Sequence, residues 1–285
     1  MTLASRRHAL RMVAGAALAS VAAGLVRSAS LEKVREKGVL RVAVYADLRL
    51  FSWREGSKVL GIDADLGRAL AEALGVRVDL WDFVADEEVG DDLRNTVWRG
   101  PLLGGQVADV MLHAPYDLAF ARRHDRVAIV APYCRETFAL AYVPEGGARF
   151  EGPLPGLAGR RVAVELAGLP DLFLSAQFGG VLRAQLVREP TGDAAVRAVL
   201  AGRADAVIAT RAQIEHAGLA QGLRLRQAPL PGLLARGWDV GLAVRDDSRD
   251  LGDALEEAVR ELAQDGRLDR MFAGYGVARQ PPALA

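Results

Sequence analysis

The residue types that most often carry chemistry are few in this chain. It has one cysteine, Cys134, and four histidines, which argues against iron–sulfur clusters, cysteine-rich zinc sites and centres built on several histidines. The spacings of a phosphate-binding loop, a dinucleotide fingerprint, a zinc-protease helix and a hydrolase nucleophile elbow are absent from the sequence. No cofactor or metal is therefore expected. Acid–base chemistry would fall to carboxylates, and the candidates are Glu165 and Asp239, each at the end of a predicted strand.

The composition is that of a folded globular protein. The chain has 285 residues, of which 51% are hydrophobic and 25% charged, which is typical of one large domain or two smaller ones. Lys and Arg together number 36, and so do Asp and Glu. Because this balance leaves no basic field, no nucleic-acid partner is expected.

Residues 1–30 are typical of an export signal peptide. They contain four Arg and no acidic residue, and Ser28-Ala29-Ser30 offers small residues for a signal peptidase. The uncharged run Met12–Val26 is shorter than the ~20 residues of a membrane-spanning helix. Arg6-Arg7 favours the twin-arginine export route, with the general secretory route as the alternative. The sequence thus predicts a mature, periplasmic protein from which this segment has been removed.

Strands that alternate with helices predict an α/β fold with mainly parallel sheets. Leu40, Val42 and Val44 share one face of a predicted strand over 39–44. A loop is expected over 45–61, and then a helix from Asp63 that carries leucines at helical spacing as far as Gly75. Further elements are expected as strands at 76–80 and 108–112, with polar helix and loop at 86–100.

Two Pro- and Gly-rich stretches, 144–156 and 229–237, interrupt this alternation. After the first, it starts afresh with strands at 162–164 and 205–208 and helices at 171–177 and 193–200. After the second come a strand at 239–244 and a helix for which Ser248 is the expected N-cap. The pattern predicts two lobes joined by two crossing strands: lobe 1 from 31–136 and 241–279, lobe 2 from 137–240, and a tail at 280–285. Small ligands favour such interlobe clefts.

Four segments carry a resemblance to a known family. They are Leu40–Val44 with Phe51-Ser52-Trp53 and Gly61–Leu66; Ala108–Met111 with Arg122-Arg123 and Ala131-Pro132-Tyr133; Gly202–Val207; and Leu262–Gly266 with Gly274-Tyr275-Gly276. In this order they resemble the extracytoplasmic solute-binding proteins of family 3, the amino-acid ABC-transporter type. The resemblance covers 40–277 and implies a type II periplasmic-binding fold. It also implies a monomer that closes on a small solute and delivers it to a membrane ABC permease.

The resemblance implies aromatic and cationic ligand contacts in lobe 1. Phe51 matches the aromatic residue that packs against the ligand, and Trp53 is a candidate second wall. Arg123 lies nine residues before Pro132, as the family arginine that grips a ligand carboxylate does. A guanidinium suits a carboxylate because it forms two parallel charged hydrogen bonds. The adjacent Arg122 is the alternative.

Further contacts are implied on both lobes. Tyr116 stands where the family often has a hydroxyl, while His113 beside it is expected to be a satisfied core histidine. Gly168 stands where a helix N-terminus meets the ligand carboxylate. Asp239 is included as an acid that could receive a ligand ammonium.

Position 210 bears on the kind of ligand. Thr210 stands where amino-acid binders of the family have an Asp that pairs with the ligand ammonium. A cation without its counter-charge in a closed cleft is costly. A carboxylate or an uncharged solute is therefore expected rather than a common α-amino acid, unless another acid such as Asp117 or Asp239 takes that role.

Two alternatives to a transport function stay open. Arg94-Asn95-Thr96 resembles relatives that accompany periplasmic quinoprotein alcohol dehydrogenases, so the partner could be such a dehydrogenase. A dehydratase of small carboxylates on the same scaffold is the other alternative, with Glu165 or Asp239 as its acid or base. The leading prediction is a binding protein and not an enzyme.

Overall fold

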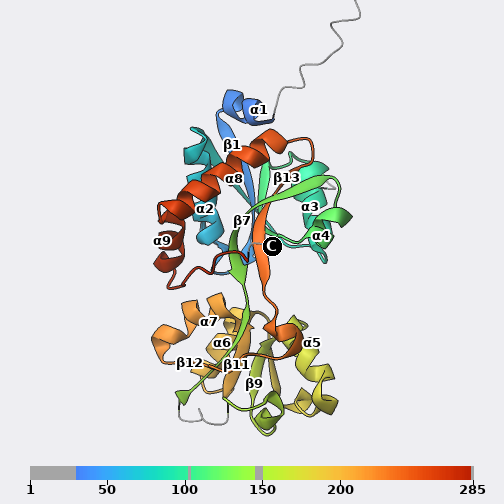
Figure 1. Ribbon diagram of the computed structural model, residues 1–285, viewed down its shortest axis with the longest axis vertical. Coiled ribbons are helices and arrows are strands. Elements are labelled where there is room, and N and C mark those ends of the chain that lie inside the picture. Colours follow the sequence, from blue (N-terminus) through green and yellow to red (C-terminus); the bar gives the residue numbers. More distant parts are fainter. Residues whose placement is uncertain (1–29, 102–103, 145–149, 284–285) are drawn as a thin grey trace, which may run out of the picture.

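The structure is a computed structural model that describes residues 30–101, 104–144 and 150–283. Two lobes are stacked along the longest axis (Figure 1), and each is built around a five-stranded sheet. The predicted two-lobed α/β fold is confirmed. The predicted export signal lies outside the described residues as far as residue 29. Ser30 already begins helix α1 (Ser30–Lys37), and its hydroxyl donates to Asp250 at 3.0 Å.

The sheet of lobe 1 has the strand order β5-β1-β6-β13-β7. β1 runs parallel to β5 and β6, whereas β13 is antiparallel to both β6 and β7. The strand that returns from lobe 2 is thus inserted between two strands of lobe 1. The bounds are β1 (Val39–Tyr45), β5 (Arg77–Phe83), β6 (Val110–Pro115), β7 (Val127–Glu136) and β13 (Trp238–Arg245).

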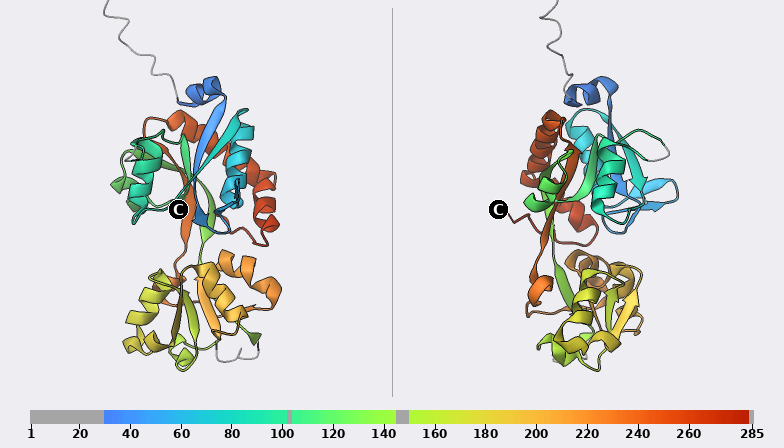
Figure 2. Two further views of the ribbon diagram at one scale, coloured as in Figure 1. Left: turned by 180° about the vertical axis from the view of Figure 1, so that it is seen from behind. Right: turned by 90° about the vertical axis from the view of Figure 1, so that its right-hand side faces the viewer.

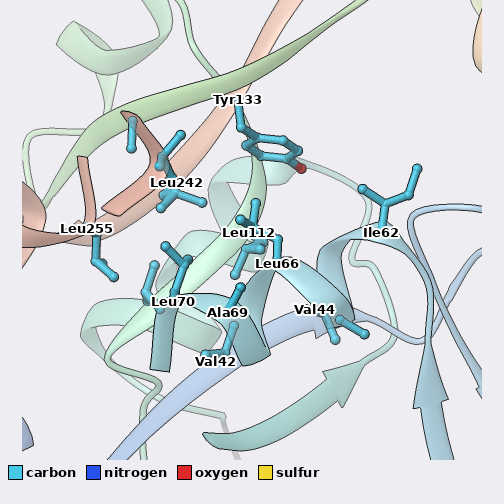
Figure 3. Packing of buried hydrophobic residues seen from close by; sticks show 14 of the residues in the cluster. Val42, Val44, Ile62, Leu66, Ala69, Leu70, Leu112, Tyr133, Leu242 and Leu255 are labelled. Carbon is cyan, nitrogen blue, oxygen red and sulfur yellow. The ribbon is translucent and has the colours of Figure 1, made fainter. Parts of the chain in front are cut away.

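Helices cover both faces of this sheet. Figure 3 shows the core on the face that is covered by α2 and α8. Leu66 and Leu70 of α2 pack with Leu255 of α8 against β1, β6 and β13. Burying a leucine side chain contributes roughly 1.5–3 kcal/mol, so these apolar stripes hold the layers together. One face carries α2 (Ile62–Ala73), α8 (Arg249–Gln264) and α9 (Arg267–Gly274); the other carries α3 (Val89–Leu93), the π-helical turn η1 (Arg94–Trp98) and α4 (Leu118–Arg123).

Lobe 2 repeats the plan on a smaller scale, with the strand order β10-β9-β11-β8-β12. β9 is parallel to β10 and β11, and β8 is antiparallel to β11 and β12. The strands are β8 (Phe138–Tyr142), β9 (Val162–Glu165), β10 (Leu186–Glu189), β11 (Ala206–Thr210) and β12 (Arg224–Leu225); the helices are α5 (Leu169–Ala176), α6 (Gly192–Leu200) and α7 (Arg211–Ala217).

One local prediction is wrong and another is confirmed only in position. The stretch 45–61, expected as a loop, contains a small antiparallel sheet of β2 (Asp47–Leu48), β3 (Ser52–Glu55) and β4 (Lys58–Leu60). These strands are too short to show a hydrophobic alternation, and their turn depends on Gly56 at φ +59°. Ser248 occupies the N-cap of α8 as predicted, but its side chain makes no capping hydrogen bond and donates to Asp247 instead.

The chain crosses between the lobes twice (Figure 2). β7 ends at Glu136 and β8 begins at Phe138, while β13 begins at Trp238, directly paired with Glu136. Phe138 and Trp238, one from each crossing, pack together with their ring centroids 5.1 Å apart. The tail also joins the hinge, because the carbonyl of Gln280 accepts from the Arg135 amide at 2.9 Å.

A buried carboxyl lies at this hinge. Glu136 is 5% exposed. Burial raises its pKa to about 7, against the smaller lowering effects of His113 and of a hydrogen bond with Thr210. The protonated form, which costs less to bury, is therefore favoured in the folded protein at mildly acidic pH.

Replacing Glu136 should change how stability depends on pH. The folded pKa is about 7 and the ordinary value is 4.5, so the folded state binds more protons between these limits. The free energy of unfolding then falls as pH rises through this window and levels off above it. In Glu136→Gln this decline, up to about 3 kcal/mol, should disappear. Urea denaturation from pH 4.5 to 8 measures it. The exposed control Glu72→Gln should keep the decline, and an unchanged decline in Glu136→Gln would refute the assignment.

Candidate ligand-binding cleft

A cleft of about 780 Å³ lies between the lobes, within the size range of small-molecule sites. It is lined by both lobes and by the start of β13, so its shape depends on how the lobes are placed. Its polar and aromatic lining residues are Tyr45, Asp47, Arg49, Trp53, Arg54, Asp86, Glu87, Asp92 and His113 from lobe 1, Glu165, Thr191, Asp193, Arg197 and Gln213 from lobe 2, and Trp238.

The small sheet of 47–60 supplies a cationic and aromatic corner. The guanidinium of Arg49 lies over the ring of Trp53, 5.1 Å from its centroid, and Trp53 packs edge-on against Tyr275. Arg54 is paired with Asp82. Within the described residues Arg49 has no acidic partner, so its charge is available to a ligand.

A buried carboxylate supports the same wall. The Tyr45 hydroxyl donates to Asp92 at 2.8 Å, and the Asp86 amide donates to the other carboxylate oxygen at 2.7 Å. Asp92 is 2% exposed, and burial raises the pKa of Asp92 and that of Tyr45. These two donors hold the segment around Asp86 against β1.

His113 forms part of the cleft floor. Its Nδ1 lies 3.1 Å from a carboxylate oxygen of Asp63, and its ring packs edge-on against Phe51 with centroids 4.4 Å apart. The side chain is nevertheless 16% exposed and lines the cleft. His113 is thus bonded to the core as expected, but it also faces the place where a ligand would lie.

The wall of lobe 2 is formed where strand β9 ends and helix α6 begins. The carboxylate of Glu165 accepts from the Gly192 amide at 3.1 Å, and burial raises the pKa of Glu165. Thr191 caps α6 by accepting from the Ala194 amide. Asp193 forms an ion pair with Arg197, whereas Glu165 has no basic partner among the described residues. The available charge of this wall is therefore negative.

Trp53 is the predicted contact that lines the cleft. Phe51 is 3% exposed and packs between His113 and Phe272, so it supports the floor from below. Tyr116 is 42% exposed and lies beside Gly241, outside the cleft lining. Asp239 is paired with Arg135 at 2.7 Å and also accepts from the Ala283 amide.

Arg122 and Arg123 lie on the exposed surface of α4, away from the cleft lining. Asp117 caps this helix by accepting from the Phe120 amide at 2.7 Å, which fixes the helical register. Arg123 lines a separate depression of about 290 Å³ with Arg94, His124 and Arg126. Arg123 is therefore on a helix whose exposed side carries it away from the cleft, which its spacing from Pro132 did not reveal.

Gly168 and Thr210 both begin helices. Gly168 occupies the N-cap of α5, and neither residue lines the cleft. The Thr210 hydroxyl accepts from the Gln213 amide at 3.3 Å in a capping box and also bonds Glu136. The acid that does line the cleft is Glu165. The expectation of no common amino acid rested on position 210 alone, and Glu165 supplies a carboxylate from another element.

The segment Arg94-Asn95-Thr96 has local partners. Asn95 donates to the Asp86 side chain at 2.7 Å, and the buried Thr96 hydroxyl donates to the Asp92 carbonyl at 2.7 Å. These bonds brace the cleft wall. The quinoprotein dehydrogenase partner stays a prediction.

Several lining residues were not predicted. Arg49 lies in the stretch 45–61 that was expected as a loop, close to Trp53 in the sequence. Asp193 and Arg197 occupy successive turns at the start of a helix that was predicted. The usable signal was the place of that helix, since helix N-termini and strand ends gather at ligand sites in α/β folds. Among the described residues, no group of three or more His, Cys, Asp or Glu side chains is placed to hold a metal ion.

Comparisons with known proteins agree on the fold. No protein-family profile matches the chain. An ancestral cationic amino-acid solute-binding protein has the same fold, with a TM-score of 0.69 at 20% identity over 87% of this chain and 99% of that one. An amino-acid ABC transporter substrate-binding protein from Streptococcus pneumoniae, bound to L-arginine, gives 0.61 at 20% identity over 88% and 99%. These structural neighbours are amino-acid solute-binding proteins.

A curated relative adds a partial match in sequence. Cyclohexadienyl dehydratase of Pseudomonas aeruginosa is 37% identical over 75 residues, which is 26% of this chain and 28% of the enzyme. The match thus spans little more than a quarter of that enzyme. In the part of the chain that the structure describes, no helix is both long enough and apolar enough to cross a membrane.

Removing the Tyr45 hydroxyl should destabilise the cleft wall. Tyr45→Phe leaves the buried Asp92 with one donor in place of two, which should lower the free energy of unfolding by about 1–3 kcal/mol at neutral pH. Urea denaturation measures the loss. The exposed Tyr116→Phe is the matched control and should change stability by less than about 0.5 kcal/mol. Equal effects of both substitutions would contradict the role of the Tyr45–Asp92 bond.

Proposed function

We propose that this chain is an exported solute-binding protein that captures a small carboxylate or amino-acid-like solute between its lobes and delivers it to a membrane ABC transporter. The observation that carries the proposal is the cleft itself, which is lined from both lobes and from the crossing strand β13. The amino-acid-binding proteins of the same fold support it, as does the signal-like pattern of residues 1–30.

The charges of the cleft favour a ligand with two different polar ends. Arg49 of lobe 1 suits a carboxylate, because guanidinium–carboxylate hydrogen bonds are charge-assisted. Glu165 of lobe 2 suits an ammonium or hydroxyl group. A solute with a carboxylate at one end and a donor at the other would satisfy both walls when water is expelled.

Closure follows from where these contacts lie. A ligand that touches both lobes interacts more strongly with a closed arrangement than with an open one, and it therefore shifts the equilibrium towards closure. The lobes can rotate as rigid bodies because each has its own sheet and core. They are joined by the two strand crossings and by the contacts of the C-terminal segment with Arg135 and α7. A transporter could then distinguish the loaded protein from the empty one by its shape.

Ligand binding should both stabilise and compact the protein. A thermal-shift screen of small carboxylates, hydroxy acids and amino acids is expected to find a ligand that, at 100 times its Kd, raises the free energy of unfolding by about 2.7 kcal/mol. Small-angle X-ray scattering of the same complex should give a smaller radius of gyration. A complete screen without stabilisation would refute the proposal, and so would stabilisation without compaction, which contradicts hinge closure.

Two arginine substitutions separate the cleft from the surface of α4. Arg49→Ala should weaken binding of a carboxylate hit by about tenfold or more, because it removes a charge-assisted contact. Arg123→Ala should leave the Kd within about twofold, since its guanidinium faces a different depression. Isothermal titration calorimetry measures both. If Arg123→Ala weakened binding and Arg49→Ala did not, the ligand carboxylate would be assigned to Arg123 and not to Arg49.

A dehydratase is the second candidate, favoured by the position of Glu165 in the cleft and by the partial match to cyclohexadienyl dehydratase. Burial raises the pKa of Glu165, which helps a carboxyl to keep a proton for a leaving hydroxyl group. The test is to incubate the protein with cyclohexadienyl hydroxy acids and follow aromatic absorbance. Catalysis that is lost in Glu165→Gln would favour the enzyme over the transport function.

A further inference from the structure

We propose that His113 recognises the carboxylate of the bound solute, with its ring held as an imidazolium between Asp63 on one side and the ligand carboxylate on the other. This inference rests on the proposed function and deepens it by naming the ligand group and the residue that selects it.

A β-bulge directs the His113 side chain into the cleft. Gly241 and Ala243 of β13 pair with Ala114 and Met111 of β6, so β6 has one residue more than β13 across this interval. His113 is one of the two residues in it, and it adopts φ +63°. Bulges of this kind re-aim side chains and are common beside functional sites. A non-glycine residue in the left-handed region is uncommon, and its observation at a cleft suggests a functional constraint.

Asp63 fixes which ring nitrogen faces the ligand. It lies in the first turn of α2, is 0% exposed, and accepts from the Tyr133 hydroxyl at 2.6 Å. Its second oxygen is 3.1 Å from Nδ1 of His113. Since a carboxylate can only accept, Nδ1 carries a proton. Nε2 is then the ring nitrogen left for a ligand, and no side chain or backbone group of the described residues bonds to it.

The surroundings allow the ring to be charged when a carboxylate arrives. Asp63 of α2 supplies the counter-charge to the ring. Tyr133 of β7 donates to Asp63, and its hydroxyl lies 3.3 Å from Nδ1 of His113. Glu136 of β7 interacts electrostatically with the ring, and Tyr45 of β1 contacts its edge. A ligand carboxylate would add a second negative group at Nε2, which favours the imidazolium.

Arg49 completes the chemistry on the same lobe. It and His113 both line the cleft, and Arg49 has no acidic partner among the described residues. A ligand carboxylate at His113 would have Arg49 as a second cation in the same wall, which also holds the acids Asp47, Asp86 and Glu87. Glu165 then remains for the far end of the solute. Because the two cations of lobe 1 recognise the negative charge, amides and esters of the same shape should bind more weakly than the carboxylate.

Nuclear magnetic resonance of histidine rings tests this without a known ligand. The full chain has four histidines and can be labelled with ¹⁵N at their rings. Acetate and acetamide are the probes, because they have the same shape and differ in charge. Acetate should raise the pH at which the His113 ring titrates, and acetamide should not, at constant ionic strength. The ring of His124, which packs on Phe120, is the internal control and should respond equally to both probes.

Variants assign the signal and test the role of Asp63. His113→Asn should remove the responding signal, and Asn tolerates a positive φ, so the fold should be kept. Asp63→Asn should abolish the acetate-induced shift while the ring signal remains. For a carboxylate hit of the thermal screen, His113→Asn should weaken binding about tenfold, whereas His124→Asn should not.

The outcomes separate this inference from the proposed function. A His113 ring that titrates identically with acetate and acetamide overturns the inference, even if the thermal screen finds a ligand and the transport function stands. An acetate-specific shift supports the carboxylate site, even if no ligand compacts the protein and the transport function fails. A proton taken up on binding the hit, measured by calorimetry in two buffers, would agree with the imidazolium, and proton release would contradict it.

Discussion

The paired strands that cross between the lobes are the constraint on which the rest of this structure depends. β13 lies between β6 and β7 in the sheet of lobe 1, and its first residue, Trp238, pairs with Glu136 at the last position of β7. On the lobe 2 side, the amide of Ala278 donates to Glu215 of α7, and His216 bonds the Tyr275 carbonyl. These contacts fasten α7 to the C-terminal segment, so the lobes are joined here by more than the two crossing strands.

This arrangement explains why the cleft combines unlike walls. The lobe 1 wall includes the small sheet of 47–60 and the end of β6, and the lobe 2 wall is the junction of β9 with α6. Among the described residues, Arg49 of the first wall has no acidic partner and Glu165 of the second wall has no basic partner, while the first wall also carries the acids Asp47, Asp86 and Glu87. Unpaired charged groups of this kind are stable only where solvent or a ligand reaches them, because burying an unpaired charge costs free energy. Their separation on two lobes means that a ligand able to bridge them stabilises the closed arrangement.

The fold could be predicted from the sequence because its signals are local and repeated. Leu66 and Leu70 mark α2, and Leu40, Val42 and Val44 mark β1, by periodicity that any helix or strand must follow to bury one face. The restart of the alternation after residue 156 likewise indicated a second lobe. The short strands of 47–60 were missed because two to four residues carry no period, and their pairing depends on a turn at Gly56.

The candidate site was harder to predict, because side-chain direction there is set by features that leave little trace in the sequence. Arg123 has the expected spacing, but capping by Asp117 turns it to the outer surface. Thr210 has the expected position, but its hydroxyl is engaged by α7 and by Glu136. His113 looked like a core residue, and only the bulge between β6 and β13 brings it into the cleft.

These residues also connect the cleft floor to the hinge. Glu136 is the last residue of β7, its carboxyl bonds Thr210 at the start of α7, and a positive charge on His113 lowers its pKa. A ligand carboxylate that holds His113 as an imidazolium would therefore favour the ionised form of Glu136, and the linkage is reciprocal. A neutral ring would remove that lowering effect, so the pKa of Glu136 would be higher. A ligand carboxylate on the floor and the charge of Glu136 at the crossing would thus be coupled by the electrostatic interaction between His113 and Glu136. The lobes need not move for that coupling to act.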